Sequence, residues 1–154
     1  MKSKFFSIAI LALGLPVFVS CSTDDDNSDE TLIDAQELPE KAQDFVTTYF
    51  PEADYSRVER NTVVENDGTL YEVDLTNNYE VDFNAEGDWV DVDGNGQEIP
   101  AAFIPETMAN YLAENYADLF ISGIDSEPTG YEVELSNDLD VIFDLDGNFL
   151  SEDK

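Results

Sequence analysis

One pattern occurs twice in this chain, and this repeat constrains the fold more than any other feature. Residues 71–93 align with residues 131–153 at an offset of 60, and nine of the 23 aligned positions are identical. The octets FNAEGDWV and FDLDGNFL belong to this alignment, and upstream the segment LPEKAQDFVTTYF matches the later segment IPETMANYLAENY. Because a repeated segment builds one supersecondary unit per copy, we expect two tandem units, about residues 38–95 and 104–154.

Each unit is expected to begin with a helix. Pro39-Glu40 and Pro105-Glu106 place a proline in the first turn and a carboxylate near the positive end of the helix dipole. Apolar residues then recur at the spacing of one helical face, which favours packing of each helix against the core. These residues are Leu38, Ala42, Phe45, Val46 and Tyr49 in the first copy and Ile104, Met108, Tyr111, Leu112 and Leu119 in the second.

Downstream of each helix, apolar and acidic residues alternate with a period of two. This alternation predicts antiparallel strands with an apolar inner face and an acidic outer face. Pairing Val73 with Val81 keeps the apolar side chains of residues 71–83 on one face and leaves Asn78 in the left-handed position of a three-residue loop. Asp138 holds the same position in the second copy.

Each unit also has an earlier candidate strand, about residues 55–64 in the first copy and 120–125 in the second. Each unit is then a helix followed by four antiparallel strands. The predicted fold class is therefore α+β, with one eight-stranded antiparallel sheet and both helices on one face.

The turn of the last hairpin in each unit decides where two aromatic residues lie. A two-residue primed turn at Glu86-Gly87 would place Phe83 opposite Val90 and would turn the aromatic residues of both copies away from the helices. A three-residue loop with the glycine in the left-handed conformation would instead shift the register by one residue and bury both aromatics. We favour the primed turn, because it continues the apolar alternation. The apolar anchors predicted on the open face are then Trp89, Phe149 and Ile142.

The first 20 residues have the features of a secretory signal peptide. Lys2 and Lys4 precede an apolar run that is too short to cross a membrane as a helix. The run ends in LPVFVSC, which resembles the lipobox at which a cysteine is acylated, although Phe18 replaces the usual leucine. An ordinary signal peptide is the alternative. We expect residues 1–20 to be a lipoprotein signal peptide and Cys21 to carry the lipid of an outer-membrane lipoprotein.

Residues 21–37 are predicted to be an acidic, disordered tether. The segment STDDDNSDE has no apolar and no basic residue, so it cannot bury enough surface to fold. The tether acts as a spacer that holds the domain away from the bilayer. An acidic run directly after a lipidated cysteine also resembles a surface-export signal of Gram-negative lipoproteins. Both locations therefore stay open, the periplasmic face of the outer membrane and the cell surface.

Composition excludes several functional classes. All 36 Asp and Glu follow the signal peptide, against two lysines and two arginines, so the mature chain has a net charge of 4 − 36 = −32. Such a charge repels phosphate backbones, so no nucleic-acid partner is expected. The chain has no histidine, and its single cysteine is the predicted acylation site, which argues against catalytic triads, thiol chemistry and ordinary zinc sites. We therefore predict a non-enzymatic protein without a cofactor.

The doubled segments also point to a family. GTLYEVDL…YEVDFNAEGDWV and TGYEVEL…DVIFDLDGNFL, each after an L/I-P-E helix, resemble the PepSY-like, beta-lactamase-inhibitor-like family of secreted bacterial proteins. The resemblance covers nearly all of residues 38–154 and implies a curved sheet whose open face receives a partner. It implies no activity. Lactamase inhibition is poorly supported, because the true inhibitor closes its loops with disulfides that this chain cannot form.

A binding or inhibitor-like module is the first functional hypothesis. Outward-facing carboxylates would give the open face a negative field that favours a basic protein or peptide partner. The alternative is a face that is acidic only to remain soluble. We expect a monomer that meets the membrane only through its lipid anchor. Beside the three apolar anchors, the predicted binding residues are Glu72, Asp74, Glu80, Asp82, Glu132, Glu134, Asp140 and Asp144.

A calcium site is the second functional hypothesis. In the segment DVDGNGQE, Asp91, Asp93 and Asn95 match the first three ligand positions of a calcium-binding loop, and Gly96 matches its glycine. Ala102 stands where such a loop requires a bidentate glutamate. A linker rich in turn-forming residues has the same composition.

Overall fold

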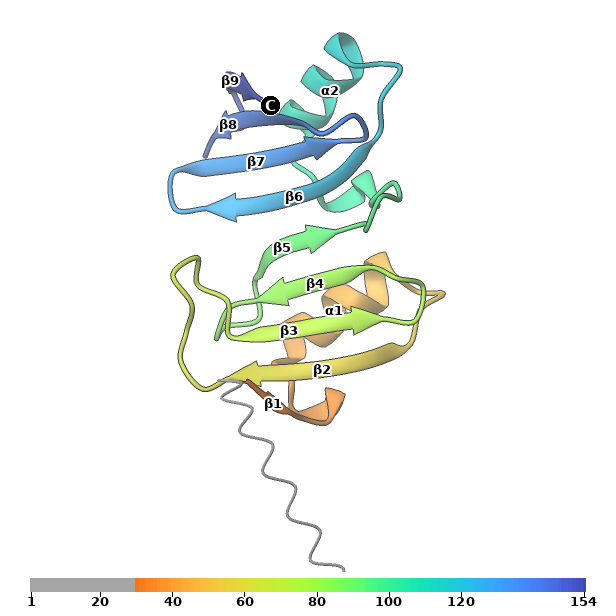
Figure 1. Ribbon diagram of the computed structural model, residues 1–154, viewed down its shortest axis with the longest axis vertical. Coiled ribbons are helices and arrows are strands. Elements are labelled where there is room, and N and C mark those ends of the chain that lie inside the picture. The colour runs from red at the N-terminus through yellow and green to blue at the C-terminus, as the bar shows by residue number, and fades with distance from the viewer. Residues whose placement is uncertain (1–29) are drawn as a thin grey trace, which may run out of the picture.

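The computed structural model describes residues 30–154, so the signal peptide, Cys21 and the segment STDDDNSD lie outside the described residues. The described chain forms one open nine-stranded antiparallel sheet, in which the strands follow one another in chain order, together with two α-helices (Figure 1). The predicted α+β class is confirmed. From Glu30 onwards, no helix is long and apolar enough to span a bilayer.

The elements have the following bounds. They are β1 (Glu30–Leu32), the 3₁₀ helix η1 (Ala35–Glu37), α1 (Glu40–Tyr49), β2 (Tyr55–Asn61), β3 (Tyr71–Leu75), β4 (Glu80–Phe83), β5 (Trp89–Asp93), the 3₁₀ helix η2 (Ala101–Phe103), α2 (Glu106–Asn115), β6 (Ile121–Glu127), β7 (Gly130–Leu135), β8 (Leu139–Asp144) and β9 (Phe149–Asp153).

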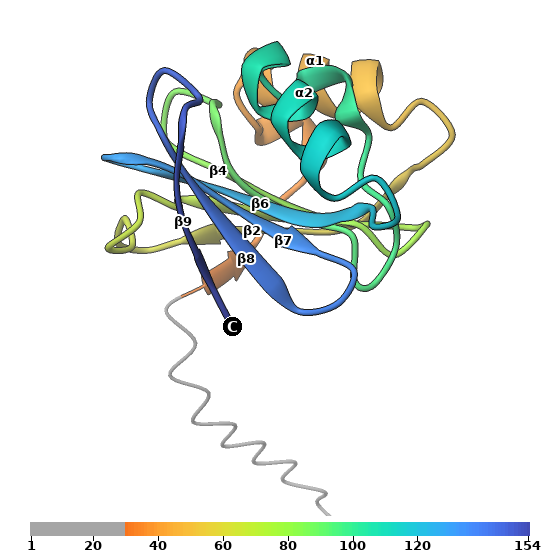
Figure 2. The same cartoon turned by 90° about the horizontal axis from the view of Figure 1, so that it is seen from above.

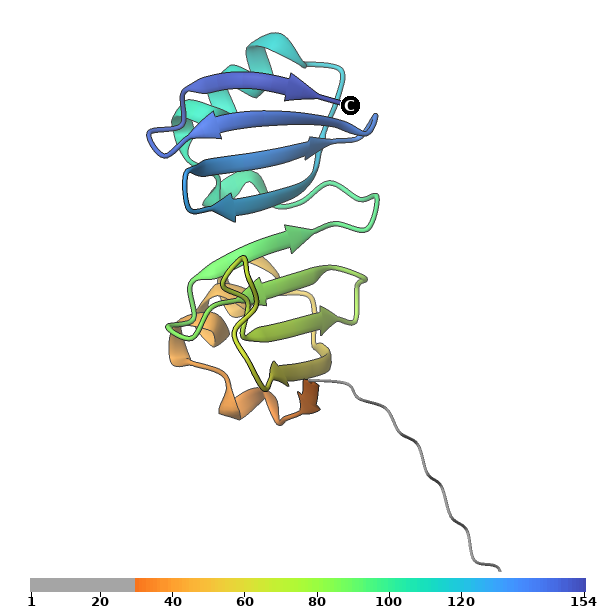
Figure 3. The ribbon, with the colours of Figure 1, turned by 60° about the vertical axis from the view of Figure 1, so that its left-hand side comes forward.

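Both helices lie on the same face of the sheet, and the opposite face is open (Figure 2). The sheet twists along its length (Figure 3). The edge strands β1 and β9 are first and last in the strand order, so they lie at opposite ends of the sheet. This arrangement agrees with the predicted placement of the two helices. It also means that the inward and outward residues of each strand meet different environments.

The two helices begin and end in the same way. Pro39 and Pro105 are the N-cap residues, and the first helical residue in each case is a glutamate near the positive end of the dipole. Each helix buries its apolar stripe, with Val46 and Leu112 among its most enclosed residues. The stripes therefore serve the core, as the sequence analysis predicts.

One continuous core lies between the helices and the sheet. Inward-facing residues of the central strands are fully buried, among them Val73, Val81 and Phe83 in the first half and Val141 and Phe143 in the second. Each such side chain stabilises the fold by about 1.5–3 kcal/mol relative to an exposed position. The first hairpin of each half has the predicted register, and Asn78 and Asp138 have the predicted positive φ, at 68° and 61°.

The tether prediction is wrong for residues 30–37. Residues Glu30–Leu32 form the edge strand β1, which pairs with β2. This additional strand brings the sheet to nine strands, one more than predicted. Asp34 and Glu37 then form a capping box around η1. The prediction extends the acidic composition of residues 22–30 to a segment that contains Leu32, Ile33 and Ala35. Ile33 and Ala35 pack against the core, and backbone pairing holds β1 against β2.

The primed-turn prediction is wrong in both halves. Phe83 pairs with Trp89, and a bulge follows Asp82, whereas Val81 still pairs with Val92 as predicted. Five residues, 84–88, join β4 to β5, and a backbone hydrogen bond from Asn84 to Asp88 closes a three-residue loop in which only Gly87 has positive φ, at 80°. The β8–β9 hairpin has the same bulge and the same glycine conformation.

The side chain of Asn84 explains this turn. Its Oδ1 accepts hydrogen bonds from the backbone N–H of Glu86 and of Asp88, which holds the loop in a conformation with one left-handed residue. Gly87 is also pressed against α1, because a Cβ at this position would lie 2.8 Å from the Cβ of Pro39. The glycine is therefore fixed both by its φ and by this close approach.

Candidate functional site

The open face of the sheet carries two rows of carboxylates that cross it from strand to strand. They arise because each strand alternates, so that the neighbours of the buried valines and phenylalanines point away from the helices. Register places the carboxylates of adjacent strands directly opposite one another. The first acidic row is Glu59, Glu72, Asp82, Asp91, Asp125 and Glu132. The second acidic row is Asp74, Glu80, Asp93, Glu134, Asp140 and Asp153, and it is interrupted on β6, where Gly123 lies between Asp93 and Glu134.

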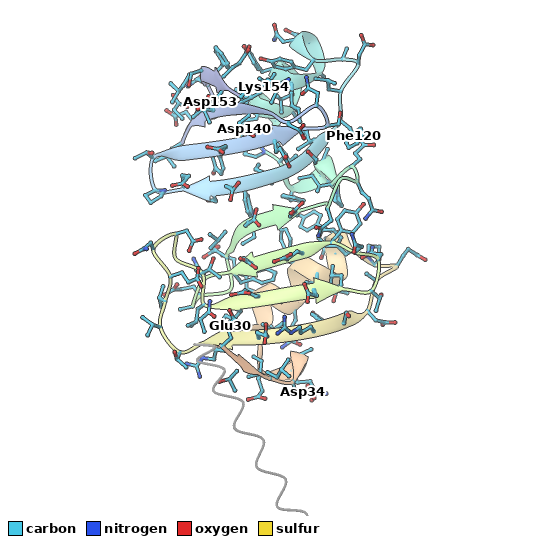
Figure 4. The ribbon with its side chains drawn as sticks, in the orientation of Figure 1. Glu30, Asp34, Phe120, Asp140, Asp153 and Lys154 are labelled. Atoms are coloured by element: carbon cyan, nitrogen blue, oxygen red, sulfur yellow. The ribbon has the colours of Figure 1, made fainter. Side chains whose placement is uncertain are left out.

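Figure 4 shows this face toward the viewer, with Asp140 and Asp153 of the second acidic row labelled. Neither of the two described α-helices covers it (Figure 2). Arg57 is the basic residue aligned with these rows, opposite Asp74 at the β2 end, and its guanidinium lies 2.7 Å from a carboxylate oxygen of Glu59. Like charges directly opposite one another across strands destabilise a sheet, so the rows cost stability in the absence of a compensating cation.

The centre of the first acidic row holds its protons unusually tightly. Burial, reinforced by the charges of Asp91 and Glu72, raises the pKa of Asp82 to about 8. Burial and the charge of Asp125 likewise raise the pKa of Asp91 to about 8. The pKa of Asp125 is raised to about 6, again mainly by burial. One carboxylate oxygen of Asp82 is buried without a hydrogen-bond partner in the described structure.

A tighter cluster lies where β1 joins the sheet. Carboxylate oxygens of Glu30, Glu59 and Glu72 all lie within 4.8 Å of one another. Asn61 donates a hydrogen bond of 3.0 Å to Glu72 and one of 3.1 Å to Glu65. Glu59 is only 6% exposed, and burial raises its pKa although Arg57 acts in the opposite direction. Three close carboxylates of this kind match the oxygen ligands that Ca²⁺ prefers.

Most of the predicted acidic binding residues lie where the sequence analysis places them. Seven of them, all except Asp144, belong to the two acidic rows, and Ile142 lies on the same face between Glu132 and Ser151. Asp144 instead supports the β8–β9 turn, because its Oδ1 accepts the backbone N–H groups of Asp146 and Asn148. Hydrogen bonds from Asn148 lower the pKa of Asp144.

The predicted aromatic anchors lie on the wrong side of the sheet. Trp89 is partly buried on the helix side, with its ring 5.5 Å from that of Phe103. Phe149 stacks on Tyr111 of α2 at 4.8 Å and is 37% exposed. The bulges after Asp82 and Ile142 cause this displacement, because each shifts the following pair by one residue. The open face therefore lacks the aromatic hot spot that the sequence analysis assigns to it.

The predicted calcium loop does not form. Asp91 and Asp93 lie on the extended strand β5, where residues two apart are about 6.6 Å apart along the strand, and they point into different acidic rows. Asn95 lies in the following turn with a φ of 49°, and its backbone N–H donates to Asp93 Oδ1 at 2.6 Å. These three side chains do not wrap around one position.

Three members of the acidic rows are not among the residues predicted from the sequence. Glu59, Asp125 and Asp153 occupy them together with the predicted residues. The signal for Glu59 is its place next to Val58 in β2. Asp125 belongs to the rows only because β5 pairs with β6, and such a pairing between distant segments leaves no local trace in the sequence.

Comparison with known proteins agrees with this architecture. A sequence profile of the family described as "Putative beta-lactamase-inhibitor-like, PepSY-like" matches residues 69–151. No curated protein matches the chain significantly. A solved structure described as a "putative calcium-regulated periplasmic protein" of Bacteroides thetaiotaomicron is 30% identical, with a TM-score of 0.75 over 82% of this chain and 98% of that one.

Two further structures come from Bacteroides vulgatus. One, described as a "putative periplasmic protein of unknown function", is 28% identical, with a TM-score of 0.75 over 81% of this chain and 99% of that one. The other, also described as periplasmic, is 28% identical, with a TM-score of 0.74 over 83% and 99%. The chain therefore belongs to the PepSY-like, beta-lactamase-inhibitor-like family.

Proposed function

We propose that this protein is a non-enzymatic binding module whose open sheet face binds a basic protein or peptide. The observation that carries the proposal is the pair of acidic rows, which cross the sheet on the face opposite α1 and α2. Repulsion between the paired carboxylates destabilises the free protein. A cationic partner relieves this repulsion when it binds, and the relief adds to its affinity. Nucleic acid is not a partner under this proposal, because the charge has the wrong sign.

Charge-matched variants test this proposal. The face variant combines Asp74→Asn, Glu80→Gln, Glu134→Gln and Asp140→Asn. The control variant combines Asp44→Asn, Glu52→Gln, Glu114→Gln and Asp118→Asn, which are exposed residues outside the rows. Both remove four negative charges, so a difference between them reports the face rather than net charge.

Polylysine serves as the defined basic ligand, with titrations at low and high salt. We expect the face variant to bind at least about tenfold more weakly than the control variant at low salt, with a smaller difference at high salt, because salt screens exposed charges beyond about 10 Å. Equal affinities of the two variants for polylysine would mean that net charge alone determines binding, and this result would contradict a binding face. Envelope proteins retained by the wild type and lost by the face variant are then candidates for the natural partner.

Calcium is the second candidate, and a different observation favours it. The carboxylates of Glu30, Glu59 and Glu72 lie close enough to share one ion, and one structural neighbour is described as calcium-regulated. Calorimetry tests it with Ca²⁺ at physiological ionic strength, with Glu72→Gln as the site variant and Glu86→Gln as the control. Saturable binding that only Glu72→Gln weakens would support the site. Weak heat that is equal in all three proteins would dispose of it.

We further propose that Cys21 anchors the protein to the outer membrane, on the periplasmic face or at the cell surface. The periplasmic descriptions of the neighbours support an envelope location, and LPVFVSC supports the anchor. Labelling with a radioactive fatty acid should mark the wild type and not Cys21→Ala. Protease treatment of whole cells then separates the two faces of the membrane.

The chain is also proposed to consist of two tandem units. Bulges recur at matching places, after Tyr55 and Ile121 in the first strand of each unit. Gly87 approaches the first turn of α1 just as Gly147 approaches that of α2, where a Cβ would lie 3.3 Å from Thr107. Superposition of the two halves in a crystal structure tests this proposal, and unrelated helix positions in the two halves would contradict it.

A further inference from the structure

Strand β9 is an open edge of the sheet. It is last in the strand order, and among the strands of residues 30–154 it pairs only with β8. All five of its residues are exposed. Figure 3 shows β9 at the end of the sheet, with no described strand beside its outer edge. The backbone N–H and C=O groups on that edge are therefore free to pair with another extended chain.

The internal counterpart of β9 shows what this edge accepts. β5 aligns with β9 at the offset of 60, and both strands follow the same loop and the same bulge. The edge of β5 that corresponds to the free edge of β9 is occupied by β6 in antiparallel register, with Val92 opposite Ile124. A strand added to β9 in the same register would lie opposite Glu152, which aligns with Val92.

The side chains of the two edges differ in a way that selects the added strand. Val92 is fully buried, whereas Glu152 is exposed, and its carboxylate accepts a hydrogen bond from the hydroxyl of Tyr116. A carboxylate at an inward-facing edge position disfavours pairing with an apolar strand such as β6. It favours a strand with a basic residue at that position. Asp153, paired with Asp140, adds negative charge beside it.

Two exposed apolar residues precede the acidic pair Glu152 and Asp153 in the chain. Leu150 on β9 is 57% exposed, and Leu145 in the preceding turn is 62% exposed. They offer contact area to the apolar residues of an incoming strand, which alternate with its basic ones. A second copy of this chain fits less well, because each copy carries the same acidic edge and a net charge of −32 after Cys21.

We propose that β9 binds an extended segment of another protein, with a basic residue opposite Glu152 and apolar residues beside it, as a tenth strand of the sheet. The inference rests on the proposed function in that the partner is basic. The inference differs from the proposed function because it assigns a second contact between the protein and its partner. This contact forms through the backbone of β9 at the sheet edge and not through the acidic rows.

Peptides of alternating lysine and valine, about ten residues long, test the edge directly. Two further peptides carry N-methyl groups on alternate amides, each blocking one edge of the extended chain. We expect one of them to bind the full-length protein at least tenfold more weakly than the unmodified peptide. We also expect Glu152→Gln to weaken binding of the unmodified peptide about threefold or more, with Glu114→Gln as the control. Amide hydrogen exchange of β9 should slow when the peptide binds.

The outcomes separate the two proposals. Unchanged affinity of both methylated peptides, with no protection of β9, would overturn the edge inference while the face variant still tests the acidic rows. The face variant could bind the unmodified peptide with the affinity of the wild type while a methylated peptide fails to bind the wild type. That result would support binding at β9 and contradict binding at the acidic rows. Protection of β9 in the protein alone, with a dimer in sedimentation, would overturn the inference by naming a second copy as the occupant.

Discussion

At the scale of single residues, the carboxyl group of Asp82 is the part of the open face whose pKa departs far from its ordinary value and whose buried oxygen has no hydrogen-bond partner in the described structure. Asp82 lies in the middle of the first acidic row. Its pKa in the folded protein is about 8, against an ordinary value of 3.8, because burial disfavours its charged form. At neutral pH this residue is therefore largely protonated in the free protein, and a bound cation would displace the proton.

This raised pKa predicts how stability depends on pH. Because the folded pKa exceeds the unfolded one, the folded state binds more protons between about pH 4 and pH 8, and the free energy of unfolding falls as pH rises through that window. We expect a higher melting temperature at pH 5 than at pH 8. We also expect Asp82→Asn to raise the free energy of unfolding at pH 8 by about 1–3 kcal/mol and to have a smaller effect at pH 5.

Thermal melts at the two pH values, with Asp44→Asn as the exposed control, check this prediction. A melting temperature that rises from pH 5 to pH 8 would contradict the assignment of Asp82, as would equal effects of the two substitutions.

At the scale of elements, the sequence predicts strands better than it predicts what joins them. Alternation in residues 71–83 gives the first hairpin register correctly, because one buried face fixes the pairing. The second hairpin fails because the choice of loop depends on the side chain of Asn84 and on contact between Gly87 and α1. Strand β1 is missed because an edge strand is held by backbone hydrogen bonds, which composition does not reveal.

Two glycines separate backbone strain from close approach. Gly87 and Gly96 have nearly equal φ, at 80° and 81°, but only Gly87 has neighbours where a Cβ would lie, with Pro39 at 2.8 Å. We expect Gly96→Ala to lower the free energy of unfolding by about 1 kcal/mol and Gly87→Ala to lower it by about 2–4 kcal/mol. Denaturant unfolding of both variants checks this. Equal losses would show that α1 does not press on the turn.

At the scale of the whole molecule, the acidic charge is visible in composition, but its arrangement is not. The net charge of −32 predicts repulsion within the folded chain, whereas the two acidic rows depend on pairings such as β5 with β6 that only the fold supplies. Alternation along the strands therefore predicts correctly that seven of the eight acidic binding residues lie on the open face. The aromatic anchors are predicted on the wrong side, because each bulge places the aromatic residue, and not the residue after it, opposite an inward-facing phenylalanine.

Salt should stabilise the molecule as a whole. Counterions screen the repulsion among exposed carboxylates, so the melting temperature at pH 8 should rise by several degrees between about 0.01 M and 0.5 M NaCl. The face variant should show a smaller rise than the control variant, since the rows hold carboxylates directly opposite one another. An equal rise in both would mean that net charge alone, and not the rows, sets the electrostatic cost.

The most direct test of the central claim maps a bound basic ligand on the protein by nuclear magnetic resonance. A lysine-rich peptide is titrated into the isotope-labelled protein at low salt, and backbone shifts are followed residue by residue. We predict shifts concentrated on the strands of the acidic rows, including those of Glu72 and Glu134, and we predict that these shifts disappear at high salt. Shifts centred on α1 and α2, or spread evenly over both faces, would contradict a binding role for the open face.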